Sequence, residues 1–214
     1  MASYGQLLAD AKSWLKRQDI DARFPSWVSQ VETEIAETLR ARCMVLRASQ
    51  AIDANFISLP VDFLEFESVA CALCGKALAL EDHFTGPLPG GPGCQCGTPG
   101  PATAYRLVGS CIEFLPHPTI PDPPDPTWQP QIVRTAWYAK PKPLIAPADT
   151  NAVLENLYSI YLFGVVRYGA MFGLDDDREA QMTTRFGEAV TLANRWKEAS
   201  QYSGAPLRAV VRSF

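Results

Sequence analysis

A long apolar stretch at residues 154–172 constrains the fold of this chain more than any other feature. Its sequence, LENLYSIYLFGVVRYGAMF, contains only two charged residues, Glu155 and Arg167, so nearly every side of it has to be hidden from water. About 18 apolar residues suffice to cross a bilayer, but an unpaired charge such as Arg167 is costly in hydrocarbon. We therefore expect a buried helix of a bundle or of a subunit interface, in which Arg167 meets a carboxylate or points into a polar channel.

The residues on either side of this stretch indicate where helices begin and end. Asn151 is suited to cap the helix that contains the stretch, and Gly173 is suited to end it. The three aspartates at positions 175–177 then place carboxylates at the positive end of the next helix dipole. We expect this next helix to extend from residue 176 to about residue 202, and capping explains the aspartates without a bound cation.

Two amphipathic helices are predicted near the N-terminus, at residues 4–19 and from Pro25 onward. Apolar residues recur there at spacings of three and four, which is the helical period; the second set is Val28, Val31, Ile35 and Leu39. The charges at Glu32, Glu34 and Glu37 are most simply a solvated face. We expect the two helices to form an antiparallel hairpin that covers the apolar helix at residues 154–172.

Residues 45–139 change to short runs with a period near two, which indicates strands. The candidates are residues 45–49, 56–59, 65–71, 104–108, 112–115 and 132–138, and Gly109-Ser110 is a plausible tight turn between two of them. Residues 86–101 contain eleven Gly or Pro in sixteen positions, and residues 116–130 contain seven prolines. Both segments are therefore predicted to be loops or extended chain.

The predicted fold class is α+β and mainly α. Two helices from each end of the chain form a four-helix bundle, which comprises residues 1–44 and 145–202, and a β-rich lobe at residues 45–144 is inserted between them. Gly164 and Gly169 cost helix propensity, which is tolerable where another backbone approaches closely. Residues 203–214 are predicted to be an extended docking tail. Its apolar and basic residues, which suit strand addition to another chain, are Leu207, Arg208, Val210, Val211, Arg212 and Phe214.

Composition limits the classes of function. The 19 basic and 23 acidic residues give a net charge of −4, which provides no bulk attraction to nucleic acid or to acidic membranes. The first residues lack the charged and apolar regions of a signal peptide, so we expect the protein to be made in a reducing cytoplasm. No nucleophile elbow, phosphate-binding glycine loop or metalloprotease helix motif is present, and we therefore expect no enzyme.

Several short motifs, spread over most of the chain in a characteristic order, resemble one known family. They are Trp14-Leu15-Lys16-Arg17, Phe24-Pro25, Glu34-Ile35, the runs at residues 39–44 (LRARCM) and 59–64 (LPVDFL), Gly97-Thr98-Pro99 before Tyr105, Tyr138-Ala139-Lys140, and residues 158–164. Through the order and spacing of these motifs, the chain resembles the head-to-tail adaptor, or connector, proteins of tailed bacteriophages. The resemblance implies a structural virion protein of the neck, with no required cofactor and no catalytic residues.

The same resemblance implies the partners. Such adaptors form a homo-oligomeric ring, usually twelvefold, between the portal protein and the tail or nozzle proteins. The helices pack around a channel through which DNA passes, the β-rich lobe faces tail components, and the C-terminal tail docks on the portal or on a neighbouring subunit. Residues 86–101 and 116–130 depart from the family pattern.

The cysteines support a competing hypothesis. Cys71 and Cys74 form a Cys-x-x-Cys-Gly turn, and Cys94 and Cys96 follow across the loop. Two such pairs can hold a structural zinc ion, which would cross-link a loop rich in Gly and Pro, or they can form disulfides in the mature particle. The alternative function is thus that of a zinc-ribbon protein, either one that binds nucleic acid or a regulatory protein. The remaining cysteines, Cys43 and Cys111, are expected in the core. His83 could replace one cysteine as a zinc ligand, but a lone histidine in a loop is more often solvated, and His117 lies among prolines with no partner in view.

Overall fold

The computed structural model contains two compact units, residues 1–44 with 140–214 and residues 45–139. It describes residues 2–72, 75–81, 102–115 and 130–202, with side chains through Arg195. We call residues 1–44 with 140–214 the helical unit and residues 45–139 the β unit. Each unit is described by itself.

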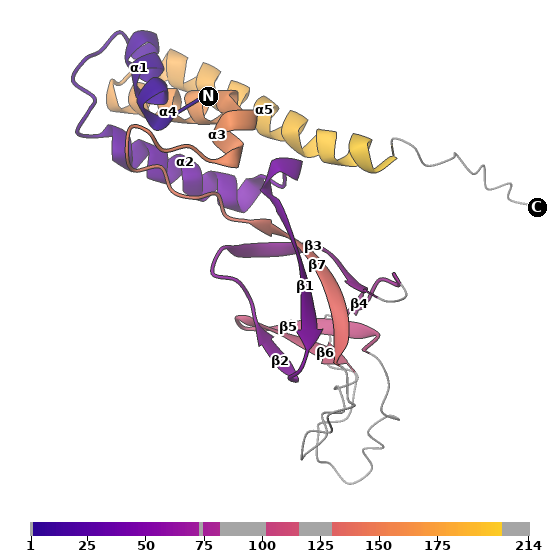
Figure 1. The fold of residues 1–214 in the computed structure, drawn as a ribbon. Helices are drawn as coiled ribbons and strands as arrows, with labels where there is room; N and C mark the ends of the chain where they lie inside the picture. Colours follow the sequence, from indigo (N-terminus) through magenta and orange to yellow (C-terminus); the bar gives the residue numbers. More distant parts are fainter. Residues whose placement is uncertain (1, 73–74, 82–101, 116–129, 203–214) are drawn as a thin grey trace, which may run out of the picture. The chain divides into compact units, whose positions relative to one another are not determined.

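The helical unit contains five α-helices in its described part, not the four that were predicted (Figure 1). They are α1 (Tyr4–Leu15), α2 (Phe24–Thr38), α3 (Ala152–Asn156), α4 (Tyr158–Phe172) and α5 (Asp176–Tyr202), with a short 3-10 helix, η1, at Arg42–Met44. The predicted four-helix bundle is therefore wrong, although α1, α2 and α5 form close to where the periodicity places them.

The difference arises at Leu157, where the stretch predicted as one helix divides into α3 and α4. Leu157 leaves the helical region of the Ramachandran plot, with φ −133° and ψ 46°. The side chain of the preceding residue, Asn156, donates a hydrogen bond of 2.8 Å to the carbonyl oxygen of Ala152. Asparagine side chains compete in this way for backbone groups and weaken helix interiors. The apolar stretch therefore folds as two helices instead of one.

Helix α4 is buried by other helices of the same chain, because α1, α2 and α5 all pack against it. A β-carbon built on Gly164 would lie 2.7 Å from the Val31 side chain on α2, and one built on Gly169 would collide with Leu15 on α1. The predicted cover by the N-terminal helices is thus confirmed. The close approach at both glycines is made by side chains, however, and not by the backbone of a neighbour.

The described residues of the β unit form two sheets. One has the strand order β1-β7-β3 and the other β2-β6-β5-β4. The strands are β1 (Val45–Ile52), β2 (Phe56–Ser58), β3 (Phe63–Cys71), β4 (Ala79–Leu80), β5 (Ala104–Val108), β6 (Cys111–Leu115) and β7 (Gln131–Ala139). Six of these were predicted; β4, which pairs in parallel with β5, was not. Gly109, with φ 60°, begins the predicted tight turn between β5 and β6.

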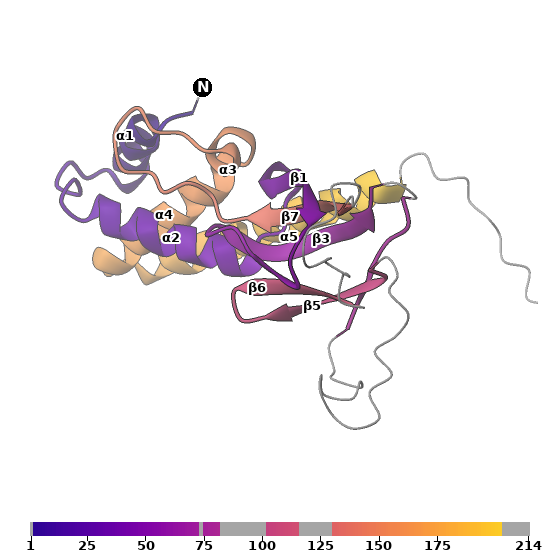
Figure 2. The ribbon, with the colours of Figure 1, turned by 60° about the horizontal axis from the view of Figure 1, so that its bottom comes forward.

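The two sheets of the β unit pack face to face around one apolar core (Figure 2). One sheet contributes Ile52, Val69 and Val133, and the other contributes Ile57, Tyr105, Ile112 and Phe114. Because the two sheets enclose this core between them, the β unit is a layered domain with its own core. Over the described residues, the fold class is α+β, with two sheets and five α-helices.

Candidate interaction surfaces

One polar cluster ties α2 to α4 in the helical unit. Arg167 on α4 donates hydrogen bonds of 2.5 and 2.6 Å to the two carboxylate oxygens of Glu34 on α2, and the Tyr168 hydroxyl also donates to Glu34. The Arg167 guanidinium lies 5.0 Å from the centre of the Phe186 ring. Burial and the hydrogen bond to Glu34 raise the pKa of Tyr168. The prediction that Arg167 meets a carboxylate is confirmed.

A second polar cluster fixes the segment that returns from β7 to α3. The backbone N–H of Leu144 donates a 2.9 Å hydrogen bond to Glu32, and Asn151 donates to the Lys142 carbonyl and to the Tyr161 hydroxyl, at 2.8 and 2.9 Å. Asn151 also caps α3 as predicted, by accepting from Leu154.

The second cluster corrects one sequence prediction, because Glu32 is only 7% exposed and not part of a solvated face. Burial raises its pKa, and the hydrogen bond from Leu144 opposes the rise. The sequence did contain a signal: Glu32 follows Val28 by four residues and precedes Ile35 by three, which places it beside the apolar face.

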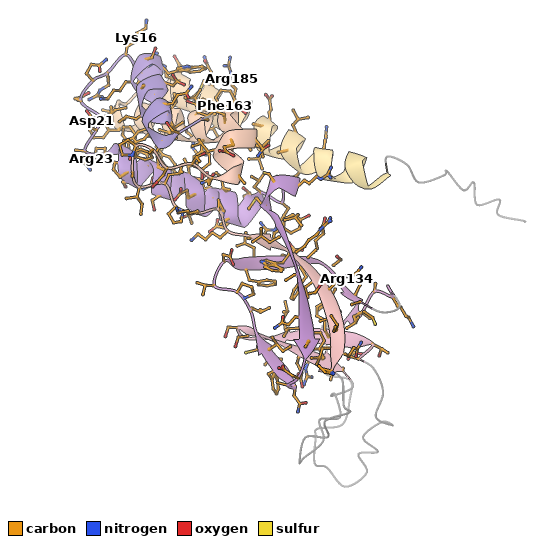
Figure 3. The ribbon with its side chains drawn as sticks, in the orientation of Figure 1. Lys16, Asp21, Arg23, Arg134, Phe163 and Arg185 are labelled. Atoms are coloured by element: carbon orange, nitrogen blue, oxygen red, sulfur yellow. The ribbon has the colours of Figure 1, made fainter. Side chains whose placement is uncertain are left out.

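An exposed apolar surface lies at the C-terminal end of α4, where the chain turns into α5. We call it the α4–α5 corner, and it consists of Met171, Phe172 and Leu174, which are 49%, 45% and 87% exposed. The guanidinium groups of Arg17 and Arg23 lie over the Phe172 ring, at 5.2 and 5.5 Å from its centre. Figure 3 shows Arg23 with Lys16 and Asp21 at this end of the helical unit. The corner therefore combines exposed apolar groups with cations that stack on an aromatic ring.

The backbone at the corner is strained. The N–H of Asp175 donates a 3.1 Å hydrogen bond to the carbonyl oxygen of Ala170. The N–H of Leu174 donates a 3.2 Å hydrogen bond to the carbonyl oxygen of Met171. This pattern requires a left-handed residue, usually glycine, but Leu174 holds that position with φ 54°, while the predicted cap Gly173 has φ −85°. Asp175 caps α5 as expected, by accepting from the Arg178 N–H at 3.2 Å.

A groove lies near the opposite end of α4. We call it the α3 groove; its volume is about 480 Å³ and it is lined by Ala41, Arg42, Cys43, Ala152, Asn156, Leu157 and Ala193. Cys43 is half-buried, so the prediction of a core residue is wrong, and burial raises the pKa of its thiol. Arg42 is exposed on the rim, and no carboxylate within the described part of the chain forms an ion pair with it.

The β unit has a second groove, of about 410 Å³, on its three-stranded sheet. Arg47 on β1 and Arg134 on β7 contribute to it, each directly opposite a small residue, Ala136 and Ser49 respectively. Figure 3 labels Arg134. Neither arginine forms an ion pair with a described carboxylate. On the other sheet, by contrast, Arg106 is paired with the buried Glu113. The three-stranded sheet thus presents two cations between small side chains.

The predicted zinc ligands are only partly within the described residues. Cys71 is buried in the core of the β unit, while Cys74, Cys94 and Cys96 lie outside the described residues, as do His83 and His117. Cys111 is half-buried at the β5–β6 hairpin, and therefore not the core residue that was predicted. The residues of the predicted docking tail also lie outside the described part of the chain: Leu207, Arg208, Val210, Val211, Arg212 and Phe214.

A family model described as SU10 adaptor protein matches residues 2–210, which is almost the whole chain. No curated protein matches it. Within the described ranges, no helix has both the length and the apolar character that crossing a bilayer requires.

Proposed function

The chain belongs to the SU10 adaptor protein family, a family of phage head–tail adaptors, as the sequence resemblance predicted, and from this we propose that it forms a ring in the neck of the virion. The match over residues 2–210 carries the proposal. In this role the ring extends the channel of the portal protein and presents a docking surface to the tail or nozzle proteins.

The packing of the helical unit supports this role. Helix α4 is covered by α1, α2 and α5 of its own chain. Its side chains Arg167 and Tyr168 are hydrogen-bonded to Glu34, and Tyr161 is hydrogen-bonded to Glu32. The subunit therefore does not need a neighbour to complete its core. Ring contacts in this proposal are made between folded subunits, through surfaces such as the α4–α5 corner and the α3 groove.

The charge of the chain is compatible with DNA that passes through the ring. Tight binding to DNA depends on many cations that neutralise phosphates, whereas this chain has a net charge of −4. A channel that holds DNA weakly lets it move during packaging and ejection. We propose that DNA is conducted without sequence recognition, and that the tail at residues 203–214 docks on the portal.

The experiment is to purify the chain alone and together with the portal protein of the same phage, and to measure the mass of the assemblies by native mass spectrometry. We expect a closed oligomer of the chain that binds the portal. A chain truncated after Tyr202 is the control for the tail, and we expect it to lose affinity for the portal. A full-length chain that stays monomeric and has no affinity for the portal would contradict the proposal.

Zinc is a separate proposal, in which Cys71, Cys74, Cys94 and Cys96 hold one structural ion. Such an ion would cross-link the loop and leave the adaptor role unchanged. Elemental analysis of protein purified under reducing conditions tests it: one zinc per chain, lost in a Cys74→Ser variant, is the expected result. Absence of stoichiometric zinc from the unmodified chain would remove the proposal.

A further inference from the structure

We propose that the α4–α5 corner of one copy docks in the α3 groove of the next copy. The proposal rests on the ring proposed above and specifies which two surfaces of the helical unit form its subunit contact. Leu174 is the residue that enters the groove, and the arginine-covered Phe172 ring borders the contact.

The corner has the properties of a docking surface. Leu174 is 87% exposed and has φ 54°, so it occupies a left-handed position where glycine or asparagine would relieve strain. The packing of the subunit does not offset this strain, because so exposed a leucine side chain buries little area within its own chain. Strain retained at an exposed apolar residue is typical of a site that binds a partner.

The groove has the properties of a receptor for an apolar side chain. Ala41, Ala152, Leu157 and Ala193 supply an apolar lining, and the division of the helix at Leu157 opens the space beside η1. Its volume of about 480 Å³ is ample for a leucine side chain. Ala152 is exposed at the start of α3, so an occupant of the groove would contact it.

One set of charges that borders the two surfaces is complementary. Asp176 and Asp177 follow Leu174 at the start of α5, where both are exposed, and no cation of the described residues is ion-paired with them. Arg42 is exposed on the groove and likewise has no described ion pair. If Leu174 enters the groove, these two aspartates approach Arg42. Complementary charges of this kind fix the orientation of a contact.

The positions of the two surfaces explain why the contact can build a ring. The groove includes Leu157, immediately before α4, and the corner begins at Met171 near the end of α4. The surfaces therefore lie at opposite ends of one helix, and each subunit offers both. A contact between two different surfaces is heterologous, and it repeats from subunit to subunit until the rotation closes the ring.

The test uses variants that remove one surface and leave the fold intact. Leu174→Asn keeps a residue that tolerates the left-handed conformation but removes the apolar side chain. Ala152→Glu places a carboxylate in the groove, opposite the approaching aspartates, at the N-terminal end of α3 where an acidic residue is favourable. The matched control is Ile145→Asn, since Ile145 is 80% exposed elsewhere on the helical unit. Circular dichroism verifies that all three variants fold.

We expect each of the two surface variants to weaken self-association by at least about tenfold, as for a residue at the centre of an interface, and Ile145→Asn to associate like the unmodified chain. The decisive sample is an equimolar mixture of the Leu174→Asn and Ala152→Glu chains. The first keeps an intact groove and the second an intact corner. The mixture should therefore form mixed dimers in native mass spectrometry, and no larger closed assembly.

Three results would overturn the contact. If both variants form the same oligomer as the unmodified chain, the ring uses other surfaces, and the proposed function survives. If each variant is monomeric but the mixture forms no dimer, the two surfaces do not bind one another; corner and groove then serve separate partners. If the unmodified chain is itself monomeric, even with the portal protein present, the ring fails and this contact fails with it.

Discussion

The helical unit and the β unit are stabilised in different ways. The helical unit joins segments from both ends of the chain, since the hydrogen bonds from Arg167 to Glu34 span 133 positions of sequence. The β unit is one continuous segment, residues 45–139, and its ion pair between Arg106 and Glu113 links neighbouring strands of a hairpin. Contacts between distant segments form more slowly than local ones. The strands of the β unit can therefore pair before α4 and α5 pack against α1 and α2 in the helical unit.

This comparison makes the two units separately testable. A substitution in the core of one unit should lower the protection of that unit's amides against hydrogen exchange and leave the other unit's amides protected.

The largest effect is expected in the β unit, from Arg106→Leu. Glu113 is 1% exposed, so removal of its cation partner leaves a buried carboxylate and should cost about 3–5 kcal/mol of unfolding free energy. Hydrogen exchange should accelerate in β5 and β6 but not in α4. Arg47→Leu, at an exposed arginine of the other sheet, is the control and should change stability by less than about 0.5 kcal/mol. Equal acceleration in α4 would show that the units unfold together.

A smaller effect is expected in the helical unit, from Gly164→Ala. The new methyl group would lie 2.7 and 3.0 Å from the γ-carbons of Val31, and such overpacking costs about 1–3 kcal/mol. The matched control is Gly187→Ala on α5, where nothing beyond the adjacent backbone of its own helix lies within 4 Å of the added carbon. There the gain in helix propensity should stabilise the protein by about 1 kcal/mol. Chemical denaturation measures the unfolding free energy of both variants. If the two substitutions changed it in the same direction, the packing described for α4 would be contradicted.

A change in the opposite direction is expected at the α4–α5 corner. Leu174→Gly relieves the left-handed strain and should raise the unfolding free energy by about 1 kcal/mol. Leu192→Gly, at another exposed leucine, inside α5, is the control and should lower the unfolding free energy by about 1 kcal/mol. Thermal denaturation compares the two variants. A loss of stability at both positions would show that Leu174 contributes to the fold and is not strained.

The smallest effect is a pH dependence that only the helical unit should show. Burial raises the pKa of Glu32, so the folded state favours the neutral carboxyl. The stabilisation is complete below the ordinary glutamate pKa of about 4.3, and is lost as the pH rises through the raised value. Glu32→Gln stays neutral, so the stability of the unmodified chain relative to this variant should fall as the pH rises. Glu37→Gln, at an exposed position on α2, is the control; the same trend there would contradict the assignment to Glu32.

The sequence predicted those features that depend on local pattern. The helices α1, α2 and α5 and six of the seven strands follow from periodicity and caps, because each residue's environment there is set by neighbours in the same element. The meeting of Arg167 with a carboxylate was also predicted, because an isolated charge in an apolar helix needs a partner.

The features that the sequence did not predict depend on contacts between distant segments or on a single competing hydrogen bond. The break at Leu157 follows from the side chain of Asn156, and an asparagine next to an apolar run is equally compatible with one continuous helix. The two-residue strand β4 exists only through its pairing with β5. The burial of Glu32 depends on Leu144, which lies 112 positions away. The predicted zinc ligands and docking tail remain predictions.

The central claim is that this adaptor assembles as a closed ring of folded subunits. Electron cryomicroscopy of the purified chain bound to its portal protein tests the claim most directly. We predict class averages with a closed ring around an open channel, and a reconstruction in which Leu174 of each subunit lies in the α3 groove of its neighbour. Isolated subunits scattered on the portal, with no contact between copies, would contradict the claim.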